Sequence, residues 1–187
     1  KIFFIQSLNI KKTHFGTNKW SDLNEFALFT NKHSDYPTAL QFWKEARTQS
    51  EQEFGKKHPD YVITLNNLGS VYEAIEQYSE AEKHYTEAME ILKTYFEENA
   101  PIYSITLGNL AGVYKELGAY QKSEKLYLDA LQIKKAVFGK NSPSVANTSN
   151  NLALLYQSIG KYSEAEKLFE KACSIAKNQG DKGKTNY

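Results

Sequence analysis

Asparagine recurs at positions 24, 66 and 150 of this 187-residue chain, in steps of 42 residues or twice that number. An asparagine side chain carries both a hydrogen-bond donor and an acceptor, so it can pair with a peptide backbone in both senses. A row formed by Asn24, Asn66 and Asn150 could therefore hold the main chain of a ligand without requiring a particular side-chain sequence. Gly108 occupies the corresponding position in the intervening step.

The residue types that catalyse reactions or bind metals show no comparable pattern. His14, His33, His58 and His84 never stand four residues apart, and the chain has neither a zinc-binding helix motif nor a phosphate-binding glycine loop. Cys173, the single cysteine, is expected to be a partly buried packing residue. The sequence predicts a protein that is not an enzyme and that uses no metal and no cofactor.

A 42-residue repeat underlies the asparagine spacing. Prolines keep the same step at Pro59, Pro101 and Pro143. Three further series also keep it: Tyr36, Tyr78, Tyr120 and Tyr162; Leu68, Leu110 and Leu152; and Tyr72, Tyr114 and Tyr156. Most of these tyrosines are expected to lie in the core.

We divide the chain into repeat units on this basis. Three regular units cover residues 58–99, 100–141 and 142–183, and a degenerate unit covers 16–57. Residues 1–15 are expected to form the last helix of an upstream repeat. Residues 184–187 are expected to be the start of a truncated further unit, or a tail.

Each unit is predicted to contain two antiparallel helices. Apolar residues at spacings of three and four follow Pro59, which suits the first turn of a helix. The second helix carries a small–aromatic–small pattern such as Ala81, Tyr85 and Ala88, which lets two helix backbones approach closely while the ring fills the remaining space. Period-two alternation is absent, so the predicted fold is all-α, a superhelical solenoid of antiparallel helix pairs.

Composition excludes several functional classes. Lys and Arg number 23 against 22 Asp and Glu, and this net charge of +1 is too small for a protein that neutralises nucleic-acid phosphates. The basic pair Lys134–Lys135 is likewise too sparse for such a surface. No apolar run approaches the roughly 18 residues of a membrane span. We therefore expect neither nucleic-acid nor membrane binding, and a cytoplasmic location.

The repeat resembles the tetratricopeptide signature. Leu65, Leu68, Gly69 and Tyr72, followed by an alanine and a tyrosine, match its order, with a leucine in place of the leading tryptophan. The 42-residue step exceeds the usual repeat of about 34 residues. The repeats of kinesin light chains are similar in sequence to three segments of this chain, residues 54–60, 64–68 and 78–82. Similar repeats occur in bacterial multidomain proteins, some of which end in a caspase-like CHAT peptidase domain.

The resemblance implies where a ligand would bind. In tetratricopeptide solenoids the first helix of each pair lines a concave face, and spacings of three, seven and ten residues keep positions on one side of a helix. The candidate peptide-binding residues on this face are Asn24, Ile63, Asn66, Ser70, Glu73, Ile105, Gly108, Gly112, Lys115, Asn147, Asn150 and Gln157. Gly108 and Gly112 leave a bare patch there, which is either a pocket for a bulky ligand side chain or a site of close helix packing.

These observations favour a protein–protein interaction scaffold that holds an extended peptide on the concave face. Two alternatives remain. The chain could be a regulatory arm of a larger protein that controls a linked enzyme domain such as a CHAT peptidase. It could also be a structural spacer, or a module that associates end to end through uncapped ends.

Overall fold

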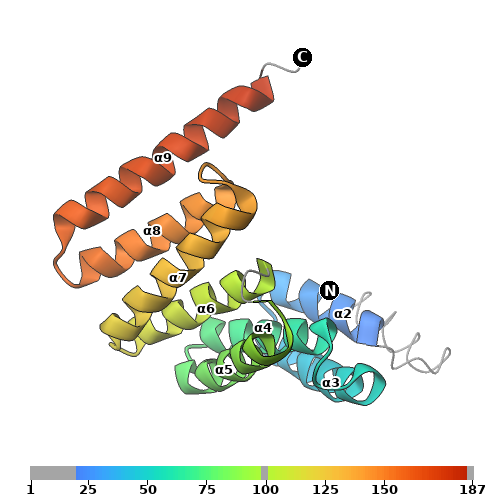
Figure 1. Cartoon of the computed structure of the whole chain (residues 1–187). Helices are drawn as coiled ribbons and strands as arrows, with labels where there is room; N and C mark the ends of the chain where they lie inside the picture. The colour runs from blue at the N-terminus through green and yellow to red at the C-terminus, as the bar shows by residue number, and fades with distance from the viewer. Residues whose placement is uncertain (1–19, 98–100, 185–187) are drawn as a thin grey trace. The chain divides into compact units, whose positions relative to one another are not determined.

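The computed structural model describes residues 20–97 and 101–184 (Figure 1). These residues form α-helices joined by short turns, with no strand in the described ranges, so the all-α prediction is confirmed. The expected helix within residues 1–15 lies outside the described part of the chain. Two compact units are distinguished, residues 1–77 and 78–187, and each is described on its own.

The first unit contains three described helices. They are α2 (Trp20–Lys32), α3 (Tyr36–Phe54) and α4 (Pro59–Ala74). Helix α3 packs against both α2 and α4. Its largest buried side chain is Trp43, which has no exposed surface and is flanked by the equally buried Ala39 and Ala46.

The second unit contains five described helices. They are α5 (Tyr78–Tyr95), α6 (Pro101–Glu116), α7 (Tyr120–Phe138), α8 (Pro143–Ser158) and α9 (Tyr162–Lys184). Each helix packs against the next one along the chain, and α6 also contacts α8. Figure 1 shows α8 and α9 lying side by side.

Proline marks helix starts that the repeat predicts, and tyrosine begins the second helices in the structure. Pro59, Pro101 and Pro143 begin α4, α6 and α8, where a missing N–H removes no intrahelical hydrogen bond. The side chains before two of these prolines cap the helix. His58 Nδ1 accepts a hydrogen bond from the Asp60 N–H at 3.2 Å, and Ser142 Oγ accepts one from the Val145 N–H at 3.4 Å.

The turn between paired helices needs one residue in the left-handed backbone conformation, with a positive φ angle. Gly118 and Gly160 have φ angles of 74° and 78°, which glycine adopts without steric cost. Ser34 and Glu76 stand at the same repeat position and also have positive φ, 57° and 61°. The turn geometry is thus imposed by the packing of the helix pair even where the residue type does not favour it.

The small–aromatic–small pattern forms the core between paired helices. Tyr127 of α7 packs with Ala111 of α6 and with Leu152 and Leu155 of α8. Ser123 takes the place of an alanine in this pattern. Its buried hydroxyl donates a hydrogen bond to the Ala111 carbonyl at 2.7 Å, so a polar atom is accommodated without an unpaired donor.

Two predictions of buried residues are wrong. One concerns tyrosines at the start of second helices, and the other concerns Cys173 of α9. Tyr120 and Tyr162, the first residues of α7 and α9, are 39% and 69% exposed. Cys173 is exposed as well. In the described chain no helix follows α9, so the side of α9 that carries Cys173 is left uncovered.

Tyrosine–glutamate contacts connect consecutive helices in the second unit. Tyr156 of α8 donates a hydrogen bond to Glu124 Oε1 of α7 at 2.8 Å, and Lys161 lies 3.3 Å from the same carboxylate oxygen. Burial, this hydrogen bond, and the charges of Glu124 and Glu164 raise the pKa of Tyr156 to about 12. Tyr114 repeats the arrangement with Glu82, and its pKa is raised for the same reasons, burial first.

The raised pKa of Tyr156 predicts how stability changes at alkaline pH. Because the folded state favours the neutral phenol, the stabilisation by Tyr156 is complete below pH 10, the ordinary tyrosine pKa, and is lost as pH rises towards about 12. We expect Tyr156→Phe to be less stable than the parent at pH 8, and the difference to shrink between pH 10 and 12. Urea unfolding of both proteins at each pH measures this. A difference that stays constant with pH would contradict the role of the hydrogen bond.

Candidate functional site

The ladder face is our name for the side of the first helices that carries the predicted peptide-binding residues. In the first unit it includes Ile63, Asn66, Ser70 and Glu73 of α4. Asn66 is only 8% exposed, and its side-chain N–H donates to the Val62 carbonyl at 3.1 Å. Ile63, Ser70 and Glu73 are half-buried. Part of the Asn66 amide therefore serves the helix itself, which the sequence did not indicate.

Asn24 is the ladder residue of α2. The residue is half-buried, and its Oδ1 atom is enclosed without a hydrogen-bond partner among the described residues. A buried carbonyl oxygen without a donor costs free energy. Leu28, one turn further along α2, is 47% exposed.

In the second unit, α6 presents an apolar and glycine-rich part of the ladder face. Ile105 is 46% exposed, and Gly108 and Gly112 are half-buried. Lys115 Nζ lies 2.8 Å from Glu116 Oε1, so its charge is paired within the same helix.

Helix α8 presents the most accessible part of the ladder face. Asn147, Asn150 and Gln157 are all exposed, and Leu154 is 39% exposed beside them. The helix carries no charged residue over its whole length. An extended ligand could therefore meet amide groups and an apolar side chain here without displacing an ion pair.

Lys134 of α7 is a residue whose position the sequence did not reveal. It is only 9% exposed. The residues at the same position in the two preceding repeats, Leu92 and Ser50, are buried as well. Its Nζ donates to Thr148 Oγ1 of α8 at 2.8 Å. Burial lowers the pKa of this amine. The signal in the sequence was Leu92, an apolar residue at the same repeat position, which could have identified Lys134 as an inward-facing cation.

The bare patch at Gly108 lies next to this amine. A Cβ atom added at Gly108 would be 3.8 Å from Lys134 Nζ; apart from the two adjoining residues and the backbone of its own helix, no other described atom lies within 4 Å of it. The space that a side chain would occupy at this step of the ladder thus borders the ammonium group of the neighbouring second helix.

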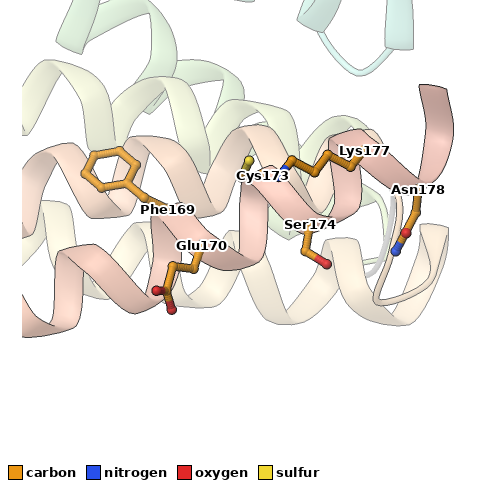
Figure 2. Close-up of a pocket in the computed structure, with 6 residues that line it drawn as sticks. All are labelled: Phe169, Glu170, Cys173, Ser174, Lys177 and Asn178. Atoms are coloured by element: carbon orange, nitrogen blue, oxygen red, sulfur yellow. The ribbon is translucent and has the colours of Figure 1, made fainter. Parts of the chain in front are cut away.

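A pocket of about 540 Å³ lies on α9, away from the predicted residues. Figure 2 shows the α9 side chains that line it: Phe169, Glu170, Cys173, Ser174, Lys177 and Asn178. On α7 the positions 42 residues earlier than Phe169 and Cys173 are Tyr127 and Leu131, which are buried. The α9 pocket therefore lies on a surface whose counterpart on α7 is covered by the following helix.

No group of three or more His, Cys, Asp or Glu side chains in the described ranges could hold a metal ion. None of the helices described is both long enough and apolar enough to cross a membrane.

Comparison with known proteins identifies the repeat. The profile of the tetratricopeptide repeat family matches residues 22–94 and 103–178, which is more than half of the chain. Among curated proteins, the clustered mitochondria protein homolog of Aspergillus niger is 28% identical over 68 residues. That match covers 36% of this chain and 5% of the relative, so the chain spans a small part of that protein.

Solved structures share the arrangement of helices. BtubC (BKLC) from P. vanneervenii superposes with a TM-score of 0.75 at 26% identity, covering 84% of this chain and 62% of that one. A variant of the putative kinesin light chain repeat protein of Podosopora anserina also gives a TM-score of 0.75, at 21% identity, covering 93% and 84% of the two chains. The second similarity concerns the fold alone.

Proposed function

Since the chain belongs to the tetratricopeptide repeat family, whose general role is protein–protein interaction, we propose that it is a scaffold that binds an extended segment of a partner protein on its ladder face. The partner segment would contact Asn147, Asn150 and Gln157 through its main chain. Its apolar side chains would pack on Ile105 and Leu154.

The observation that carries this proposal is the exposure of apolar side chains next to amides on the first helices. Ile105 and Leu154 are large, and they are 46% and 39% exposed on the ladder face. Leu154 lies one helical turn from Asn150, so a ligand strand could bury the leucine while it forms hydrogen bonds with the amide. Burial of apolar surface supplies affinity, and the amide groups fix the position of the strand.

Replacing Asn150 by alanine tests the proposal. A peptide selected from a random display library against the parent chain is expected to bind Asn150→Ala about tenfold more weakly or worse, because a lost hydrogen bond to a buried backbone costs about 1–3 kcal/mol. Fluorescence anisotropy of the labelled peptide measures the change in Kd. Asn66→Ala is unsuitable for this purpose, because Asn66 also bonds to its own helix.

Asn151→Ala is the matched control. Asn151 is the next residue of α8 and is also exposed, but it points away from the ladder positions. It should leave peptide affinity unchanged. Equal losses in the two variants, or the absence of any enriched peptide on a folded parent chain, would contradict binding on the ladder face.

Self-association is a second candidate, favoured by exposed side chains on α9. Tyr162 is 69% exposed and the α9 pocket includes the half-buried Phe169. If copies associate through these side chains, the sedimentation coefficient will rise with protein concentration, and Cys173→Glu will abolish the rise by placing a charge in the apolar contact. A sedimentation coefficient that is independent of concentration in the parent would exclude this candidate.

A further inference from the structure

The amine of Lys134 lies where three helices of the second unit meet. Lys134 belongs to α7, and its Nζ atom donates to Thr148 Oγ1 of α8 at 2.8 Å. The same atom lies 3.8 Å from the place where Gly108 of α6 would carry a Cβ atom, and apart from the two residues adjoining Gly108 and the backbone of α6 no other described atom lies within 4 Å of that place. Gly108 is half-buried, so solvent reaches α6 here. The amine therefore borders a small space that is open to solvent.

No neighbouring carboxylate keeps this amine in its protonated form. Helix α8 carries no charged residue, and the charged residues of α6, Lys115 and Glu116, lie at its end and pair with each other. Within residues 20–97 and 101–184, Lys134 forms no ion pair. Its side chain is only 9% exposed, and burial lowers its pKa. Burial of a cation without an opposite charge favours the neutral form of the amine.

The neutral amine is held in a defined direction. The Thr148 hydroxyl donates its own proton to the Ser144 carbonyl at 3.0 Å, so its oxygen accepts one N–H of Lys134. The second N–H and the lone pair of the neutral amine remain for a molecule that enters beside Gly108. Desolvation and a lowered pKa are among the means by which proteins activate a lysine as a nucleophile. The amine is therefore expected to react with a small electrophile.

The size of the open space favours an acetyl group. Asparagine occupies the repeat position of Gly108 at Asn24, Asn66 and Asn150. An asparagine side chain and the end group of an acetylated lysine contain the same heavy atoms, those of an amide and one further carbon. An acetyl group on Lys134 would thus fill a space similar to that of an asparagine side chain. Acetylation also removes the positive charge, which relieves the cost of burying an unpaired cation.

We propose that Lys134 is a site of covalent acetylation by an acetyl thioester. The lone pair of the neutral amine attacks the carbonyl carbon of the thioester and forms the C–N bond. The C–S bond breaks, the thiolate leaves with the electron pair of that bond, and the nitrogen releases one proton to the thiolate, so nothing is oxidised or reduced. The remaining amide N–H keeps its hydrogen bond to Thr148, and the acetyl group lies beside Gly108. This inference is independent of the proposed function.

The acetylation rate of each lysine tests the proposal. The full chain is treated near neutral pH with S-acetyl-N-acetylcysteamine, and peptide mass spectrometry gives the rates. We expect Lys134 to be acetylated about tenfold faster than Lys125, an exposed lysine of the same helix. In urea the two rates should become similar, because unfolding removes the surroundings that distinguish the two amines. A rate at Lys134 no higher than that at Lys125, or a preference that persists in urea, would overturn the proposal.

Lys135 tests whether a lowered pKa alone is sufficient. Burial and the charges of Lys171 and Lys140 lower the pKa of Lys135, but no hydrogen bond orients its amine among the described residues. We expect Lys135 to be acetylated about threefold more slowly than Lys134, because its amine is not held beside an open space by a hydroxyl group. Equal rates at the two lysines would mean that this geometry contributes nothing, and would refute the site.

Gly108→Val tests the open space. Valine adds an isopropyl group, whose first carbon lies 3.8 Å from Lys134 Nζ. We expect this variant, once circular dichroism shows that it is folded, to be acetylated at Lys134 about tenfold more slowly than the parent, and at Lys135 at the parental rate. Gly108→Ala adds the first carbon alone, at an ordinary contact distance, so it should slow the reaction less. An unchanged rate at Lys134 in folded Gly108→Val would refute the site. If valine prevents folding, the rates of the parent chain in buffer and in urea decide the question.

Discussion

Replacing Leu110 by alanine is expected to lower the free energy of unfolding of the second unit by about 2–5 kcal/mol. Leu110 is 1% exposed in the middle of α6, which packs against α5, α7 and α8. Removing its isobutyl group leaves a cavity that close-packed neighbours can fill only in part. Because repeat units are stabilised by their neighbours, the loss should extend beyond the helix that carries the substitution.

Chemical denaturation monitored by circular dichroism measures this effect. Leu117→Ala is the matched control, since Leu117 is 43% exposed in the turn after α6. It should change the free energy of unfolding by less than about 0.5 kcal/mol. An unchanged midpoint in Leu110→Ala would contradict the packing of α6 described above.

Replacing Trp43 by alanine is expected to have an equally large effect in the first unit, about 3–5 kcal/mol. Trp43 is completely buried between Ala39 and Ala46 on α3, and its indole ring fills the space that these small residues leave. The measurement is again the denaturation midpoint, followed by tryptophan fluorescence in the parent and by circular dichroism in the variant.

Trp43→Phe separates ring volume from the indole N–H. The Nε1 atom of Trp43 is buried and has no hydrogen-bond partner in the described structure. Phenylalanine removes this unpaired donor, and the free energy regained in this way offsets part of the stabilisation lost with the smaller buried area. A phenylalanine, Phe169, already stands at the same repeat position in α9. We expect Trp43→Phe to cost less than about 1.5 kcal/mol. A cost as large as that of alanine would mean that the indole N–H is hydrogen-bonded.

The sequence alone determined the fold class and the start of the three first helices that begin with proline. Spacings of three and four residues identify helical faces, proline favours the first helical turn, and a constant step of 42 residues repeats both signals along the chain. The small–aromatic–small pattern of α3, α5 and α7 correctly indicated which side of each second helix is buried, as Trp43, Tyr85 and Tyr127 show. These features follow from local geometry, so they can be read without knowledge of distant contacts.

Only the tertiary structure decided how individual side chains on these faces are used. Asn66 and Asn150 occupy the same repeat position, yet Asn66 is buried and bonded to its own helix while Asn150 is exposed. Lys134 belongs by residue type to the surface, but α7 directs its amine between α6 and α8. Burial depends on which helices flank a position, and that is set by residues far away in the sequence. For the same reason Cys173 is exposed on α9, although Leu131, its counterpart on α7, is buried beneath α8.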